Sequence, residues 1–299
     1  MNNYKVSIII PSYNTEEFVE ETFESIKNQT FNFEDLEIIF IDDKSTDGSV
    51  DIIKGYGEEY DNVFVYTSPE GKKGPGPSRN LGIRKATSDY IIFLDADDLM
   101  VHEYVEKVYK EISENDVDLV KSSFFFNMGD ITAPVTQNFG RVEVSHDDVG
   151  ILMDFNYLEP WATIYRREYL IEEDITFIEK FNIHESFLFA VESIAKAKKG
   201  IILLDDFQCQ IWRIHDAGLH NRTIAEQDLE YTMQCISEML LLVANENQPL
   251  SCVRKLTEFI LSLWSFDLIT SKEPMEVINA FTFATGFKVD PQSISDAFS

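Results

Sequence analysis

The sequence predicts an α/β fold, in which a mostly parallel sheet is flanked by helices and followed by a C-terminal helical extension. Apolar runs of strand length alternate with segments whose apolar residues recur at helical spacing. The apolar run at 90–94 has non-polar side chains on both faces, as expected of a parallel strand covered by helices on both sides. Beyond residue 225 the pattern is helical. The expected strands of the first hundred residues are 6–10, 36–41, 63–66 and 90–94.

Composition excludes several classes of partner. Asp and Glu number 53 against 25 Lys and Arg, which gives a net charge of −28 and argues against a nucleic acid or an anionic membrane as the main partner. The three cysteines, Cys209, Cys235 and Cys252, form no CxxC pair, so we expect neither a zinc site nor a disulfide framework. No transmembrane segment or leader peptide is recognisable. The expected location is the cytoplasm, either free or peripheral at the inner membrane face.

Two of the predicted strands end in side chains suited to ligand binding. The first strand is closed by Pro11 and followed by Tyr13, and the second ends in Asp42 and Asp43. Ligands of open α/β sheets collect beyond the carboxyl ends of the strands. We therefore expect the tyrosine and the acidic tip to face the same edge of the sheet.

Three carboxylates, Asp95, Asp97 and Asp98, directly follow the strand at 90–94. Such closely spaced charges repel one another unless water or a cation screens them, and oxygen ligands suit Mg²⁺ or Mn²⁺. One interpretation is therefore a site for a divalent cation. The alternative is a solvated loop that caps a helix, a place where aspartate is also favoured.

A glycine- and proline-rich stretch at residues 71–80 precedes a helix expected at 81–86. It carries Lys72, Lys73 and Arg79 in an otherwise acidic chain. Glycines permit close backbone approach and prolines stiffen a loop, so the stretch is interpreted as an anion-holding loop or as a plain surface turn. It lacks the residues of a Walker loop and of a dinucleotide fingerprint.

The second half of the chain has a weaker pattern. We expect a helix at 101–112, a strand at 117–126 and irregular chain at 127–145. The segment around Arg166 and Arg167 is interpreted either as an acceptor-facing surface or as a strand with a polar side. Glu185 opens an apolar helix and is either a base kept ionised by the helix dipole or a capping acid. His215 is a candidate ligand of a metal or diphosphate, or a structural histidine.

The chain carries four motifs in the order Ser7–Asn14, Asp42–Ser49, Arg79–Gly82 and Phe93–Asp98. In this order and at these spacings, they resemble those of the family-two glycosyltransferases of GT-A fold. A looser resemblance continues through Trp161–Leu170 to the Arg213-x-His215 element. The loop Gly74–Arg79 is also similar to one in transferases that add N-acetylglucosamine to wall teichoic acid.

The resemblance implies the residues of a nucleotide-sugar site. Tyr13 would stack on uracil, and Asp43 would hydrogen-bond the edge of the base. Asp97 and His215 would bind Mn²⁺ or Mg²⁺ at the diphosphate. Glu185 would be the catalytic base, although His184 replaces the acid that usually precedes it. The remaining implied contacts with the nucleotide sugar are Pro11, Arg79, Asp95 and Ala96.

The implied activity is an inverting, metal-dependent transfer of a sugar from a UDP-sugar donor to a hydroxyl acceptor. The acceptor would be a saccharide, a polyol-phosphate polymer or a glycoprotein. We expect a nucleotide-sugar-binding half at 1–100, an acceptor-binding half at 101–222 and a helical region at 223–299 through which the chain forms a homo-oligomer. Two alternatives are a sugar-1-phosphate nucleotidyltransferase, whose glycine-rich loop would follow the first strand, and a non-catalytic binding module with a degenerate site.

Overall fold

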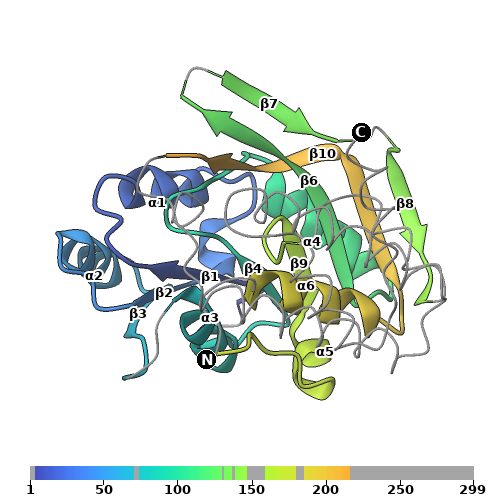
Figure 1. Cartoon of the computed structure of the whole chain (residues 1–299), viewed down its shortest axis with the longest axis horizontal. Coiled ribbons are helices and arrows are strands. Elements are labelled where there is room, and N and C mark those ends of the chain that lie inside the picture. The colour runs from blue at the N-terminus through green and yellow to red at the C-terminus, as the bar shows by residue number, and fades with distance from the viewer. Residues whose placement is uncertain are drawn as a thin grey trace, which may run out of the picture.

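The computed structural model describes residues 4–70, 74–129, 131–136, 139–146, 159–179 and 185–215 (Figure 1). The expected helical region at 223–299 lies outside these residues, as do Lys72, Lys73 and His184. The α/β class predicted from the sequence is confirmed. One continuous sheet of ten strands runs through the described chain, with helices packed against it.

The first four strands are parallel and stand in the order β3-β2-β1-β4. Their side chains form the core: every residue of β2 is buried, as is nearly every residue of β1. This is the pattern of strands covered on both faces, as their continuous apolar sequence predicted. The strands are β1 Val6–Ser12, β2 Leu36–Asp42, β3 Val63–Thr67 and β4 Tyr90–Phe93.

The second half of the sheet is mixed rather than parallel. Strand β9 runs antiparallel between β4 and β6, and β10 is parallel to β6. Residues 127–145, expected to be irregular, contain two strands that pair with β6 and with β10, each on one side only within the described part of the chain. Edge strands commonly carry charged residues and proline, so their composition is hard to tell from that of a loop. The strands are β5 Leu99–Met100, β6 Leu119–Met128, β7 Ile131–Val135, β8 Arg141–Val144, β9 Thr163–Arg166 and β10 Ile201–Arg213.

The helices pack through apolar faces at helical spacing. In α4, for example, Tyr104, Val105, Val108 and Ile112 are all buried. The helix α3 begins at Pro75, several residues before the start expected from the sequence, because proline is tolerated in the first turn of a helix. The helices are α1 Val19–Lys27, α2 Ser49–Glu59, α3 Pro75–Lys85, α4 Tyr104–Glu114, α5 Arg167–Glu172 and α6 Glu185–Ala195, with a short 3₁₀ turn, η1, at Phe33–Asp35.

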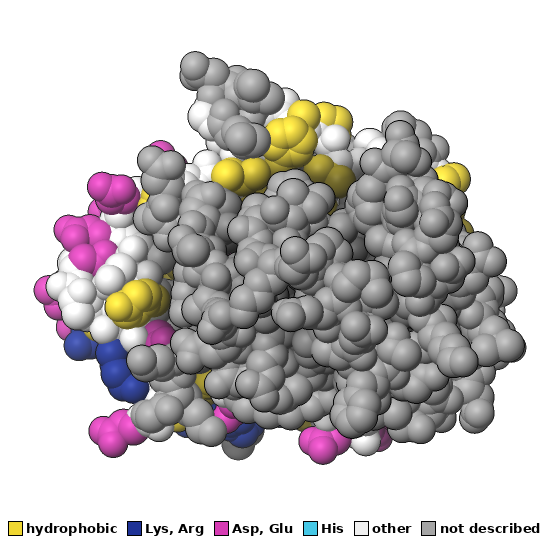
Figure 2. All heavy atoms as spheres, in the orientation of Figure 1, with side chains coloured by type: hydrophobic (Ala, Val, Ile, Leu, Met, Phe, Trp, Pro, Cys, Tyr) yellow, Lys and Arg dark blue, Asp and Glu magenta, His cyan; other side chains and the backbone are white. Residues whose placement is uncertain are grey.

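The surface reflects the acidic composition. Figure 2 shows Asp and Glu side chains gathered where α2 lies, and hydrophobic side chains beside the hairpin of β6 and β7. Among the described residues, every helix is too short or too polar to span a bilayer.

Candidate active site

The ends of β1 and β2 form the first part of the site. Ser12 and Asp42 are register partners, and the backbone N–H of Asp43 donates to the carbonyl of Ser12 over 2.8 Å. Tyr13, the next residue after β1, is 58% exposed. The tyrosine and the acidic tip therefore lie at one edge of the sheet, as expected, and the tyrosine ring is accessible to a planar ligand.

Asn14 fixes the turn after Tyr13. Its backbone has a positive φ of 52°, a conformation that asparagine tolerates better than most residues. Its side-chain oxygen accepts a 2.8 Å hydrogen bond from the backbone N–H of Thr46, and its own N–H donates to Ser45 Oγ. The two loops that carry Tyr13 and Asp43 are thus bound to each other. Pro11, which lies in β1 ahead of Tyr13, pairs in register with Ile41 of β2.

The three carboxylates of the acidic loop after β4 differ in exposure. The side chains of Asp95 and Asp97 are 29% and 31% exposed. Asp98 is buried and accepts hydrogen bonds of 2.9 Å from Gln210 Nε2 and from the backbone N–H of Arg213. Burial, reinforced by the charges of Asp97 and Asp95, raises the pKa of Asp98 well above its usual value. The interpretation of the three aspartates as one cation site therefore does not include Asp98, which anchors β10.

Asp97 and His215 come together from positions 118 residues apart, with 3.0 Å between Asp97 Oδ2 and His215 Nε2. Burial and the charge of Asp95 raise the pKa of Asp97. A bound cation would relieve that repulsion. Within the described ranges, no group of three or more His, Cys, Asp or Glu side chains is arranged to hold a metal by itself. The pair fits a cation whose remaining ligands are phosphate oxygens and water, as is usual for Mg²⁺.

Ala96 lies between the two exposed aspartates and contributes differently from them. Its side chain is buried, and its carbonyl accepts a 2.9 Å hydrogen bond from Thr22 Oγ1 of helix α1. The acidic loop is thus attached to α1 through its own backbone.

Arg79 is the centre of the site. It lies on α3 with only 3% of its side chain exposed, and its Nη2 is 2.6 Å from Asp95 Oδ1. Its Nη1 is 3.5 Å from Glu185 Oε1 and donates to Ser186 Oγ over 2.9 Å. The guanidinium also lies over the ring of Phe177. The structure therefore brings the acidic loop and Glu185 together through one buried cation, rather than placing Arg79 on a surface loop.

Glu185 is the first residue of α6 and is 5% exposed. Besides Arg79, its carboxylate accepts a 3.1 Å hydrogen bond from Ser186 Oγ. The Arg79 guanidinium and the N-terminal end of α6 both place positive charge beside this carboxylate. Sequence analysis missed Ser186, although it stands directly beside Glu185, because a lone serine in a helix carries no distinctive pattern.

The neighbours of Arg79 in the motif Arg79–Gly82 hold α3 in place. Asn80 pairs through its side-chain amide with the backbone N–H and carbonyl of Phe177, each over 2.8 Å. Gly82 lies against β1, where an added Cβ would stand 2.3 Å from Ile9 Cγ2. A side chain at this position would push the helix, and Arg79 with it, away from the sheet.

A buried lysine behind the site was not expected from the sequence. Lys121 is 4% exposed, and its Nζ donates to the carbonyl of Glu159 over 2.8 Å and to Thr163 Oγ1 over 3.2 Å. Burial lowers the pKa of Lys121 to about 8. Burial also raises the pKa of the Glu159 carboxyl to about 7. No spacing or motif in the sequence distinguishes this lysine from a surface one.

The segment after Pro160 is more buried than an acceptor-facing surface would be. Arg166 donates to the carbonyls of Val117, Ile112 and Asn115, where α4 ends. Trp161 is 7% exposed and packs edge-to-face on Phe124. The tryptophan is therefore part of the core, and Arg166 stabilises the end of α4 through these carbonyls.

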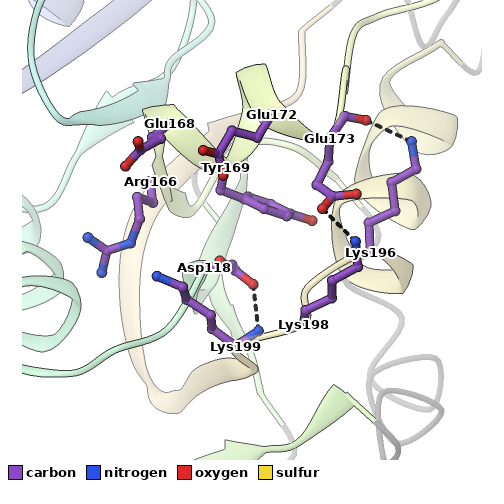
Figure 3. A pocket seen from close by; sticks show the side chains of 9 residues that line it. All are labelled: Asp118, Arg166, Glu168, Tyr169, Glu172, Glu173, Lys196, Lys198 and Lys199. Atoms are coloured by element: carbon purple, nitrogen blue, oxygen red, sulfur yellow. Dashed lines mark hydrogen bonds and ion pairs between the residues drawn. The ribbon is translucent and has the colours of Figure 1, made fainter.

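A separate cavity of about 170 Å³ lies between α5, the end of α6 and the start of β6. Figure 3 shows Glu168, Glu172 and Glu173 in the upper part of the view, with Lys196, Lys198 and Lys199 to the right and below. Lys198 pairs with Glu173 over 2.6 Å, and the backbone N–H of Lys199 donates to Asp118. Its lining shares no residue with the acidic edge, and it does not contribute to the candidate active site.

The mixed α/β sheet with its flanking helices has the architecture of proteins with the GT-A fold. Residues 7–173, more than half of the chain, match the family model described as glycosyl transferase family 2. The chain belongs to this family.

Three known proteins illustrate the similarity. A poly(ribitol-phosphate) beta-glucosyltransferase of Bacillus spizizenii is 36% identical over 197 residues, which make up 65% of this chain and 30% of that protein. The crystal structure of S. aureus TarS 1–349 with UDP-GlcNAc has a TM-score of 0.76 at 23% identity, covering 98% of this chain and 83% of that one. The mannosyltransferase PcManGT from Pyrobaculum calidifontis, in complex with GDP-Man and Mn²⁺, has a TM-score of 0.55 at 15% identity, covering 99% and 84%.

Proposed function

We propose that this protein is an inverting, metal-dependent glycosyltransferase that moves a hexosyl or N-acetylhexosaminyl group from a UDP-sugar to a hydroxyl of a polyol-phosphate polymer. The observation that carries the proposal is the convergence of Asp95 and Glu185 on Arg79, at the edge where Asp97 meets His215. A donor-side carboxylate and a candidate base are thereby held close together, as a single displacement requires.

The donor would lie along the carboxyl edge of β1, β2 and β4. The exposed ring of Tyr13 offers a stacking surface for uracil beside Pro11, and Asp43 stands at the adjoining strand end to accept a hydrogen bond from the base. Asp95 would bind the ribose, with the backbone of Ala96 beside it. Arg79 would orient Asp95 from behind rather than meet the diphosphate directly, because it is almost fully buried.

Asp97 and His215 would hold Mn²⁺ or Mg²⁺ at the diphosphate. When bound, the cation neutralises the charge that develops on the departing nucleoside diphosphate. The partly exposed Asp97 carboxylate, whose pKa is raised by burial and by the charge of Asp95, is a suitable partner for positive charge. Asp98 takes no part in this binding and fixes the strand that delivers His215.

Glu185 would act as the base. Its carboxylate would take the proton of the acceptor hydroxyl as that oxygen attacks the anomeric carbon from the face opposite the diphosphate. The C–O bond to the diphosphate breaks as the new glycosidic bond forms, so the configuration at the anomeric carbon inverts. The contact with Arg79 and the hydrogen bond from Ser186 hold this carboxylate in place.

The acceptor class rests on the Bacillus relative, whose name gives poly(ribitol-phosphate) as its substrate. We extend the proposal to the expected division of the chain, with donor-binding residues in 1–100 and acceptor-binding residues in 101–222. The helical and oligomeric character of 223–299 and the cytoplasmic location stay predictions.

Incubation with UDP-glucose or UDP-N-acetylglucosamine, Mn²⁺ and ribitol-phosphate polymer tests the proposal. Release of UDP that depends on the acceptor would support glycosyl transfer. Pyrophosphate formed from UTP and a sugar 1-phosphate would instead indicate a nucleotidyltransferase. Neither product, with retained UDP binding, would indicate a binding module.

A further inference from the structure

The residue just before helix α1, Phe18, contacts the candidate metal ligand His215. The two ring centroids are 4.3 Å apart, with an angle of 33° between the ring planes. Tyr13 is an exposed aromatic residue at this edge, whereas Phe18 is only partly exposed. The contact with the imidazole raises the question of whether Phe18 also acts on His215.

The same ring contacts Arg213, whose Cζ is 5.2 Å from the centroid of Phe18. Arg213 donates through Nε to the carbonyl of Asp97 and through Nη2 to Thr22 Oγ1 over 3.2 Å. Its Nη1 lies 2.5 Å from Glu21 Oε2. The end of β10 is therefore attached both to α1 and to the back of the acidic loop.

We propose that Phe18 is a positioning residue of the metal–diphosphate site, because its ring holds His215 against Asp97 while Arg213 fixes the backbone of Asp97. The proposal rests on the proposed function, which makes Asp97 and His215 the ligands. Residues that orient a metal ligand from behind usually act by hydrogen bonding, and here a flat ring restricts the orientation of the imidazole. Phe18 itself would touch neither metal nor substrate.

Replacement of Phe18 by leucine separates this role from simple packing. Leucine keeps an apolar side chain but offers no flat surface to the imidazole. We expect Phe18→Leu to weaken Mn²⁺-dependent UDP binding about 10-fold, in the range seen when supporting contacts of metal ligands are lost. Phe18→Tyr keeps the ring and should restore binding. Phe31→Leu is the matched control, because Phe31 is also partly buried and pairs with another aromatic ring, that of Tyr109.

Three measurements test the role of Phe18. Calorimetric titration with UDP, with and without Mn²⁺, gives the metal-dependent affinity, and kinetics should show a raised KM for the donor with a smaller change in kcat. The proton NMR spectrum of the protein without metal should show ring-current-shifted imidazole resonances, assigned by their absence in His215→Gln. Those shifts should move toward ordinary values in Phe18→Leu and stay in place in Phe31→Leu.

The outcomes separate the two proposals. If the wild-type protein binds UDP equally with and without Mn²⁺, the metal site fails and the role of Phe18 fails with it. If the wild type depends on Mn²⁺ but Phe18→Leu binds equally well, only the role of Phe18 is overturned. Equal losses in Phe18→Leu and Phe31→Leu would also overturn it, since they would indicate packing alone.

Discussion

Arg79 Nη2 lies 2.6 Å from Asp95 Oδ1, in a contact that joins helix α3 to the loop after β4. The other terminal nitrogen of the same guanidinium is 3.5 Å from Glu185 Oε1. One cation therefore serves two carboxylates with different proposed roles, one at the donor and one at the acceptor. Its removal would affect stability and catalysis together.

The first prediction concerns the stability that this cation provides. Arg79→Met leaves the buried Glu185 carboxylate without its partner and should lower the free energy of unfolding by about 3 kcal/mol. This is the lower end of the range for a broken buried ion pair, because Asp95 is 29% exposed and remains partly solvated. Urea denaturation measures the change. Arg84→Met, at an exposed position of the same helix, should stay within about 0.5 kcal/mol of wild type, and a similar result for Arg79→Met would contradict the assigned role.

The second prediction separates chemistry from donor binding. Glu185→Gln keeps the size and the hydrogen-bonding capacity of the side chain but removes the basic carboxylate. Turnover should fall about 100-fold or more, while the affinity for UDP stays near that of wild type. Initial rates and calorimetry provide the two measurements. Glu172→Gln, at an exposed position of α5, is the control and should leave both unchanged. Wild-type turnover in Glu185→Gln would remove this residue from the mechanism.

The N-terminal half of the fold was predictable because each buried strand there is a continuous apolar run that ends at a polar turn. Such runs have few alternatives to a covered parallel strand. Strands β7 and β8 were not predictable, since their stability comes from pairing with β6 and β10 rather than from their own composition. The early start of α3 was hidden by glycine and proline, which suggest a loop although proline suits a first helical turn.

The candidate site was predictable in part. The aspartates after β4 follow an apolar strand, so their place at the sheet edge came from the pattern alone. The meeting of Asp97 with His215 came only from the resemblance to a family, because no spacing rule joins residues so far apart. The burial of Arg79 and Lys121 depends on residues that are distant in the sequence, and so does the contact of Phe18 with His215. These features cannot be predicted from a single sequence.

The third prediction concerns the metal. Asp97→Ala removes the carboxylate that would bind the cation, and the stimulation of UDP binding by Mn²⁺ should disappear while metal-free binding stays close to that of wild type. Titration of UDP into each protein, with Mn²⁺ or with EDTA, measures both affinities. Asp51→Ala, on the exposed face of α2, should retain the full effect of Mn²⁺. Unchanged Mn²⁺-dependent affinity in Asp97→Ala would exclude this residue as a ligand.

The fourth prediction concerns pH and the buried Lys121. Burial lowers its pKa from 10.5 to about 8, so between these pH values the folded protein binds fewer protons at this residue than the unfolded chain does. Stability contributed by this group must therefore rise as pH rises through that window. Relative to Lys121→Met, the wild type should gain on the order of 3 kcal/mol of unfolding free energy between pH 8 and 10.5.

Urea denaturation of both proteins across this range tests the prediction through its slope, which a constant difference in packing does not alter. The hydrogen bonds to the carbonyl of Glu159 and to Thr163 persist when the amine is neutral, so their contribution does not produce the slope. Lys54→Met, at an exposed site on α2, should follow the wild-type pH dependence. A difference between wild type and Lys121→Met that stays constant from pH 8 to 10.5 would show that Lys121 keeps its ordinary pKa in the folded protein.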